Sequence, residues 1–76
     1  MKELIEFVAR SIVDHPDDVR VEEEEEGDRI VYRLYVAEDD MGKVIGKQGR
    51  IANAMRDLLK VAAVRSDAYA SLEIGD

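Results

Sequence analysis

The sequence predicts an α+β domain in which a three-stranded mixed sheet is covered on one face by three helices, in the order α-β-β-α-α-β. Three observations support this two-layer fold class. Apolar residues recur at helical spacing near the start, an alternating hairpin surrounds Gly27-Asp28, and two helical segments separate that hairpin from a last alternating stretch. The 76 residues are expected to form one domain over positions 1–76.

The first predicted element is a helix from Lys2 to about Asp14. His15-Pro16 ends it, because the residue before a proline is pushed out of the helical region of backbone space. Asp17 and Asp18 then supply turn chemistry. The apolar side of this helix repeats every three or four residues and consists of Leu4, Ile5, Val8, Ala9 and Ile12.

An antiparallel hairpin is predicted over residues 19–37, with its turn at Gly27-Asp28. Its first strand ends in five consecutive glutamates, Glu22 to Glu26, and charge of this kind protects an edge strand from pairing with other chains. The second strand runs from Arg29 to Ala37 and alternates in polarity. Its even positions are expected on the core, and these are Ile30, Tyr32, Leu34 and Val36.

Two helices are predicted after the hairpin. The acids Glu38-Asp39-Asp40 suit the N-cap and first turn of a short helix from about Asp40 to Val44 or Ile45. Gly46-Lys47-Gln48-Gly49 interrupts the pattern, and a longer helix follows from Arg50 to about Val64. The buried side of the longer helix is expected to contain Ala52, Met55, Leu58 or Leu59, and Ala62.

Ser66-Asp67 is expected to end the longer helix, and Ala68 to Ile74 alternates as a last short strand. The two helices form a crossover long enough to bring this strand beside the second strand in parallel orientation.

Charge is distributed unevenly along the chain. The formal net charge of −7 argues against a nucleic-acid partner if it is taken as evenly spread, because phosphate contacts need lysine and arginine. Residues 1–40 hold 5 basic and 14 acidic side chains, whereas residues 41–76 hold 6 basic and 4 acidic ones. Between Met41 and Arg56 there are four basic residues and no acidic one. The second half of the chain therefore offers a local cationic surface.

The segment Val44 to Ile51 has the pattern of an anion-binding loop. Gly46 and Gly49 allow a sharp turn without a Cβ to hold a ligand away, and the loop opens into a helix start whose free N–H groups favour an anion. Lys47 and Arg50 add positive charge at the same place. Gly-x-x-Gly alone is also a common tight turn. Here it lies between two helices and inside the acid-free stretch, and this context favours a phosphodiester-binding loop.

The segments Tyr32–Val36, Gly46–Arg50 and Ala52–Arg56, in this element order, resemble a KH domain of the prokaryotic (type II) topology. The likeness extends over the whole chain and is greatest to the small single-KH bacterial RNA-binding proteins of the KhpA type. It implies a four-nucleotide groove for single-stranded RNA. Where the broad KH pattern favours an aliphatic residue three positions after the second glycine, this chain has Ala52, with Ile51 one position earlier.

The resemblance also implies which residues contact RNA. The clamp consists of Gly46, Lys47, Gln48 and Gly49, with Lys43 and Ile45 before it and Arg50 after it. It further implies an RNA chaperone or post-transcriptional regulator linked to cell-envelope and cell-shape control. The implied partners are a second copy of the chain or a larger KH/Jag-domain protein of the KhpB type.

Other classes of protein are less consistent with the sequence. There is no cysteine, His15 is the only histidine, and no acid–base pair is visible, so we expect no metal, no cofactor and no enzymatic activity. No apolar run approaches about 20 residues and no signal-peptide pattern opens the chain, which predicts a cytoplasmic protein without a membrane span. The alternative function is a protein–protein adaptor that uses the same loop and helix and has little RNA affinity.

Overall fold

The computed structural model describes residues 2–65 and 69–75, and their order of helices and strands matches the predicted one. Helix α1 spans Lys2–Ile12, strand β1 Arg20–Glu26 and strand β2 Arg29–Tyr35. Helix α2 spans Met41–Ile45, helix α3 Arg50–Arg65 and strand β3 Tyr69–Gly75. Ser66, Asp67 and Ala68, where a helix end and the start of the last strand were predicted, lie outside the described residues.

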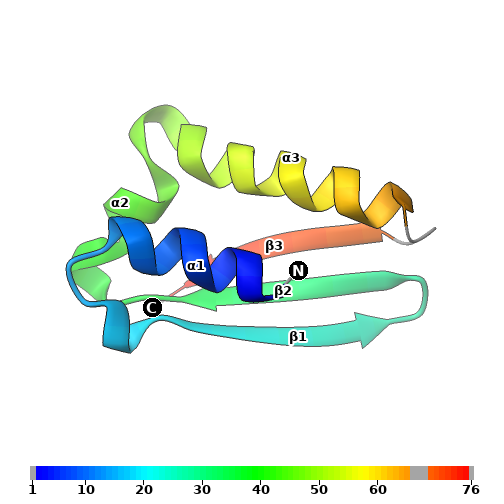
Figure 1. The fold of residues 1–76 in the computed structure, drawn as a ribbon, viewed down its shortest axis with the longest axis horizontal. Coiled ribbons are helices and arrows are strands. Elements are labelled where there is room, and N and C mark those ends of the chain that lie inside the picture. Colours follow the sequence, from blue (N-terminus) through cyan, green and yellow to red (C-terminus); the bar gives the residue numbers. More distant parts are fainter. Residues whose placement is uncertain (1, 66–68, 76) are drawn as a thin grey trace.

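The sheet has the strand order β1-β2-β3 and is mixed, as predicted. Strand β1 pairs antiparallel with β2, from Arg20 opposite Tyr35 to Glu26 opposite Arg29. Strand β3 pairs parallel with β2, from Arg29 opposite Tyr69 to Tyr35 opposite Gly75. The glutamate-rich strand is therefore an edge strand, and the other edge of the sheet belongs to β3 (Figure 1).

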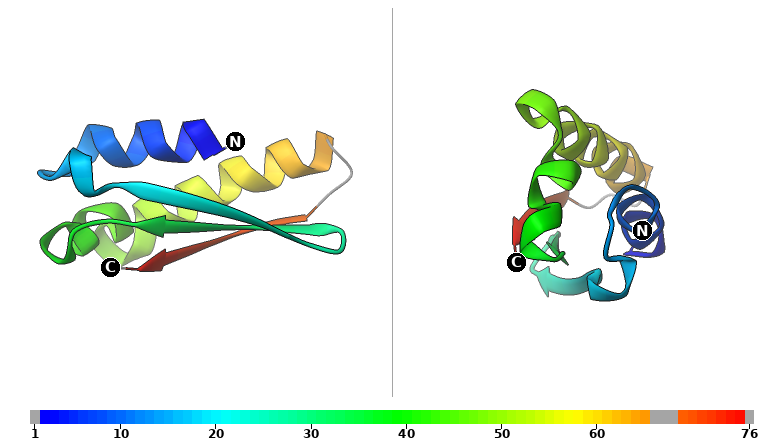
Figure 2. Two further views of the ribbon diagram at one scale, coloured as in Figure 1. Left: turned by 90° about the horizontal axis from the view of Figure 1, so that it is seen from below. Right: turned by 90° about the vertical axis from the view of Figure 1, so that its left-hand side faces the viewer.

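Helices α1 and α3 lie against the same face of the sheet (Figures 1 and 2). The even positions of β2 face these helices, and Tyr32 and Leu34 are buried as predicted. Val36, just after β2, is also buried, whereas Ile30 is only partly buried against the core. The sequence did not decide whether Leu58 or Leu59 lies on the buried side of α3. In the structure Leu59 is buried in the core and Leu58 is half exposed. The buried core cluster consists of Ile5, Ala9, Val19, Val21, Tyr32, Leu34, Val36, Val44, Met55, Leu59 and Leu72.

A short 3-10 turn, Pro16–Asp18, follows α1, in agreement with the predicted break at His15-Pro16. A second 3-10 turn, Glu38–Asp40, leads into α2. Asp40 occupies the N-cap position of α2, but its side chain makes no capping hydrogen bond there, so the predicted capping role is wrong. The Asp40 carboxylate is fully buried and accepts the backbone N–H groups of Asp14 and His15, at 3.1 and 3.0 Å. This one side chain thus joins the end of α1 to the start of α2.

The outer face of the sheet is polar and cross-linked by charge. Arg33, in the central strand, forms ion pairs with Glu24 of β1 and with Glu73 of β3. The Arg20 guanidinium lies 4.5 Å from the centre of the Tyr35 ring, a cation–π distance. Tyr35 and Tyr69 both lie on this face, and Tyr69 is largely exposed. Because Arg20 covers Tyr35, Tyr69 is the one described residue with an open aromatic ring on this side of the sheet.

Tyr32 provides a test of the packing between the sheet and the helices. Its ring is buried, and this burial, together with a hydrogen bond to Glu23 and the charge of that carboxylate, raises the pKa of Tyr32 to about 12. Since the pKa is higher in the folded protein, the neutral phenol stabilises the fold below about pH 10, and the contribution is lost as pH rises toward 12.

Between pH 8 and pH 11 the free energy of unfolding should fall in the wild-type protein. In Tyr32→Phe we expect this fall to be smaller by about 1 kcal/mol. Urea unfolding at the two pH values measures the difference. Tyr69→Phe, at an exposed tyrosine, is the matched control. Equal losses in the wild-type protein and Tyr32→Phe would contradict the prediction.

Candidate nucleic-acid interface

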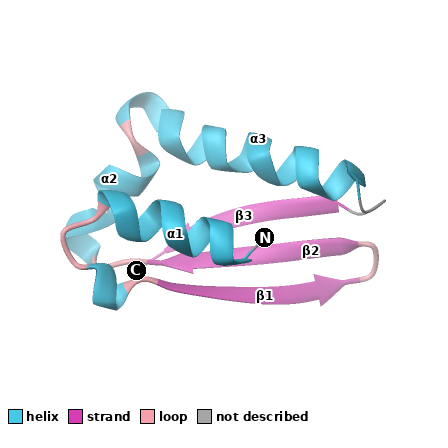
Figure 3. Cartoon of the chain, in the orientation of Figure 1, coloured by secondary structure: helices cyan, strands magenta, loops and turns pink. Residues whose placement is uncertain are grey.

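The predicted glycine loop joins α2 to α3 at one end of the molecule (Figure 3). Helix α2 ends at the hydrogen bond that the Gly46 N–H donates to the Gly42 carbonyl, at 2.9 Å. A 3-10 turn, Lys47–Gly49, follows, in which the Gly49 N–H donates to the Gly46 carbonyl at 3.2 Å. The Arg50 N–H donates to the Lys47 carbonyl and begins α3. The amides of Lys47 and Gln48 take part in none of these bonds and lie at the tip of the loop.

Gly46 is required by both conformation and space. Its φ of 77° and ψ of 174° lie in a region that is essentially restricted to glycine. A Cβ at this position would stand 2.7 Å from Ile51 Cγ1 and 2.9 Å from the Ile51 backbone nitrogen. Ile51 thus fills the space beneath the loop, and the neighbouring Ala52 is buried in the core. This explains the departure from the KH pattern, since the larger side chain supports the loop and the smaller one packs inside.

The tip of the loop is exposed and cationic. The side chains of Lys47, Gln48 and Arg50 are all exposed, and within the described part of the chain neither Lys47 nor Arg50 forms an ion pair. Gln48 adopts a positive φ of 58°, which turns the backbone sharply between the two glycines. Ile45, partly exposed at the end of α2, adds an apolar surface beside the cations. The structure therefore brings six of the seven predicted residues together, namely Ile45, Gly46, Lys47, Gln48, Gly49 and Arg50.

Lys43, the seventh predicted residue, points to a different partner. Its ammonium forms an ion pair with Asp14 and lies 3.7 Å from the Asp40 carboxylate. The hydrogen bond to Asp14, opposed by partial desolvation and reinforced by the charges of Asp14 and Asp40, raises the pKa of Lys43. In this arrangement Lys43 links α2 to the end of α1, and its charge is largely neutralised by nearby acids.

Helix α3 supplies two polar residues that sequence reasoning left out of the site. Arg56 donates from Nη2 to the Leu72 carbonyl of β3, at 3.4 Å, and from Nη1 to Asn53 Oδ1, at 3.3 Å. This pair therefore lies where α3 meets β3, which continues the cationic surface of the loop along the helix. The signal available in the sequence was the three-residue spacing of Asn53 and Arg56, which places both on one side of a helix.

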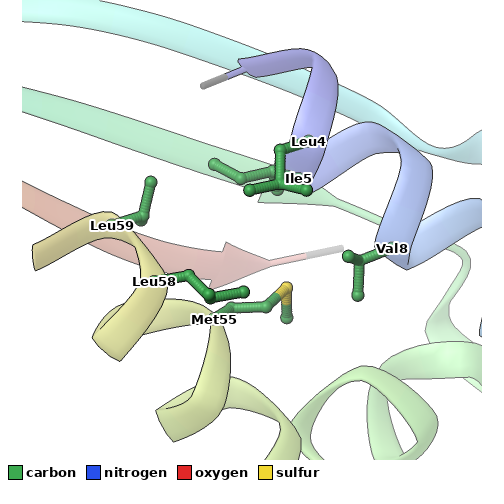
Figure 4. Close-up of a pocket in the computed structure, with 6 residues that line it drawn as sticks. All are labelled: Leu4, Ile5, Val8, Met55, Leu58 and Leu59. Carbon is green, nitrogen blue, oxygen red and sulfur yellow. The ribbon is translucent and has the colours of Figure 1, made fainter. Parts of the chain in front are cut away.

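An apolar groove lies between α1 and α3. Leu4, Ile5 and Val8 of α1 face Met55, Leu58 and Leu59 of α3 across it (Figure 4). The cavity between them is only about 10 Å³, which is too small for an organic ligand. On the same two helices, Leu4, Phe7, Leu58 and Val61 leave 39, 70, 50 and 61% of their surfaces exposed. Exposed apolar side chains gathered over two helices are typical of a surface that contacts another protein.

Within residues 2–65 and 69–75, no group of three or more histidine and acidic side chains is placed to hold a metal ion. Over the same residues, none of the helices combines the length and apolarity that a membrane crossing requires.

The strand order, the two helices joined by a glycine loop and the cationic loop tip define a KH domain of type II topology. The sequence matches the family described as "KhpA/KhpB, KH domain" over residues 2–74, and the chain belongs to that family.

Three curated relatives, each named RNA-binding protein KhpA, show how far the similarity extends. The protein of Halalkalibacterium halodurans is 50% identical over 76 residues, which cover all of both chains. The protein of Clostridium acetobutylicum is 51% identical over 97% of this chain and 99% of its own. The protein of Chlamydia pneumoniae is 43% identical over 97% of this chain and 95% of its own. The search of solved structures gave no match.

Proposed function

We propose that this chain binds single-stranded RNA and holds the phosphodiester backbone over the loop Gly46-Lys47-Gln48-Gly49. The observation that carries the proposal is the exposed charge of Lys47 and Arg50, neither of which forms an ion pair with any described residue, on a loop that glycine geometry keeps open. The amides at the loop tip and at the start of α3 suit phosphate oxygens, and a KH groove takes about four nucleotides. The relatives named RNA-binding protein KhpA support the same activity.

The residues have distinct proposed roles. Lys47 and Arg50 pair with phosphates, Gln48 donates from its side-chain amide, and Ile45 packs against a base. Gly46 and Gly49 let the nucleic-acid backbone approach. Lys43, which is paired with Asp14, contributes mainly by positioning α2. No role in this proposal requires a cofactor or a chemical step, so binding alone is the activity.

The acidic side chains of the β1–β2 hairpin complement this interface. Glu22 to Glu26 lie on the edge strand β1, and α2 and α3, which flank the loop, contain only one acidic residue between them, Asp57. Repulsion between this edge and phosphate confines RNA to the loop side of the domain. The net charge of −7 is thus compatible with RNA binding, because the charge is segregated.

A charge-reversed loop tests the proposal. We expect Lys47→Asp combined with Gln48→Asp to weaken binding to a mixed pool of short RNAs by more than 10-fold, measured by fluorescence anisotropy. The two cations assigned to phosphates, Lys47 and Arg50, predict a slope of about −1.4 for log affinity against log salt in the wild-type protein. Lys2→Asp with Ser11→Asp changes the net charge equally on α1 and is the matched control. The proposal fails if the wild-type protein has no RNA affinity even at low salt.

The second candidate function is that of a protein-binding adaptor, and the exposed apolar residues over α1 and α3 favour it.

Within the RNA-binding proposal, the same surface, formed by Leu4, Phe7, Leu58 and Val61, suits a second copy of the chain or a larger protein of the KhpB type. Pairing of two modules on one RNA would strengthen the weak binding expected from one domain. We further propose, from the likeness to proteins of the KhpA type, a role as RNA chaperone or post-transcriptional regulator in the cytoplasm, linked to cell shape and cell-wall organisation.

A further inference from the structure

A second hollow lies at the end of α3 that is remote from the glycine loop. It has a volume of about 360 Å³ and is lined by Lys60, Ala63 and Val64 of α3 and by Tyr69 and Ala70 of β3. Tyr69 leaves 67% of its surface exposed and Val64 leaves 75%. This hollow is large enough for a planar aromatic group, in contrast to the space of about 10 Å³ between α1 and α3.

The chemistry of the hollow combines one aromatic ring, one cation and small apolar walls. Within the described part of the chain, Lys60 forms no ion pair, so its ammonium is available to an anion. Arg29 of β2 lies directly opposite Tyr69 in the sheet and adds a second cation at this corner. Although the register places Tyr69 on the outer face of the sheet, it belongs to the edge strand β3 and borders the hollow together with Lys60. An exposed aromatic ring near a lysine is the combination on which proteins stack an unpaired base and hold its phosphate.

The hollow is continuous with the proposed RNA site. Asn53, Arg56 and Lys60 are spaced by three and four residues, which places them along one side of α3. Arg56 reaches the Leu72 carbonyl of β3, so the line where α3 meets β3 leads from the loop to the hollow. The distance from Arg50 to Lys60 along the helix is about 15 Å, since each residue advances the helix by about 1.5 Å. A strand held at the loop and laid along α3 therefore reaches Tyr69.

We infer that this hollow is an additional nucleobase subsite, in which a base beyond the four-nucleotide groove stacks on Tyr69 and its phosphate pairs with Lys60. The inference rests on the proposed RNA binding and extends it. It makes affinity depend on RNA length, because only an oligonucleotide that passes the groove fills the hollow.

Affinities for uniform-sequence RNAs of four to eight nucleotides test the subsite. Stacking on one aromatic side chain contributes about 10-fold or more in affinity, so the wild-type protein is expected to bind the longer RNAs at least that much more tightly than the tetramer. Tyr69→Ala removes this gain and leaves tetramer binding unchanged, whereas Tyr69→Phe retains the gain because it keeps the ring. Lys60→Gln reduces the gain in part. Tyr35→Ala is the matched control on the same sheet face.

Three outcomes separate this inference from the proposed function. If Tyr69→Ala keeps the full length dependence while the charge-reversed loop abolishes binding, the subsite is wrong and the RNA-binding function stands. If the wild-type protein binds no RNA of any length, both fail. If 5-iodouracil placed at either end of an octamer forms a photocrosslink to Tyr69, and one within a tetramer does not, the subsite is supported; a crosslink to Tyr35 alone overturns it.

Discussion

Gly46→Ala is expected to lower the free energy of unfolding by about 3 kcal/mol and to weaken RNA binding at the same time. An alanine forced into the backbone conformation of Gly46 costs on the order of 1–3 kcal/mol. The added methyl group also meets the backbone nitrogen of Ile51 at 2.9 Å, where no side-chain rotation relieves the overlap. The loop must therefore shift, and the shift moves the amides of Lys47 and Gln48. Urea unfolding and RNA anisotropy measure the two effects.

Two other glycines of the same region provide controls. Gly49 has a φ of 74°, but a Cβ there would meet only the Asn53 side chain at 3.7 Å, so Gly49→Ala should cost about 1–2 kcal/mol through backbone strain alone. Gly42 lies within α2, and a Cβ there meets nothing within 4 Å, so Gly42→Ala should stabilise the protein by about 0.5–1 kcal/mol. Equal effects at Gly46 and Gly49 would contradict the role assigned to Ile51.

Asp40→Ala is expected to lower the thermal midpoint by roughly 10 °C, because it leaves two backbone donors without their partner in the interior. Those donors are the N–H groups of Asp14 and His15, which follow the last residue of α1. The loss also removes one of the two carboxylates beside Lys43, so α2 loses part of its attachment to α1. Asp39→Ala is the matched control, since the Asp39 carboxylate is exposed and lies 3.5 Å from His15 Nε2.

The pH dependence of Asp40→Asn gives an independent check. Burial by itself raises the pKa of the Asp40 carboxyl, but the N–H groups of Asp14 and His15, together with the charges of His15 and Lys43, hold that pKa below its ordinary value. A lowered pKa in the folded protein means that the carboxylate stabilises the fold above about pH 4 and that this contribution disappears as pH falls through the folded value. The difference in thermal midpoint between the wild-type protein and Asp40→Asn should therefore be largest near pH 7 and shrink toward pH 2. A difference that is constant over this range would show that the charge of Asp40 is unimportant.

Local periodicity made most of the fold predictable. The helical repeat of Leu4, Ile5 and Val8 and the two-residue repeat around Tyr32 and Leu34 depend only on neighbours in the chain, so α1 and β2 could be predicted without coordinates. The same holds for the hairpin turn at Gly27-Asp28. The choice between Leu58 and Leu59 could not be made in this way, because two adjacent positions fit a helical face almost equally until the partner surface is known.

The candidate site was predictable to a similar extent. The glycine spacing and the acid-free stretch marked the loop from residues that are contiguous in sequence. Arg56 was not assigned to the site, because its contact with Leu72 joins residues 16 positions apart on different elements. Lys43 was assigned to it, and its hydrogen bond with Asp14, 29 positions away in the sequence, could not be foreseen from local pattern.

The sequence by itself thus determined the element order, the mixed sheet, the glycine loop and the separation of acid from base along the chain, since each is written in local pattern and spacing. Only the tertiary structure decided that Asp40 serves α1 instead of capping α2, that Lys43 is neutralised, and that Lys60 and Tyr69 share a hollow. These outcomes depend on which distant groups burial brings together. A carboxylate excluded from water accepts whatever donors the packing supplies, and an ammonium pairs with whichever acid lies within reach.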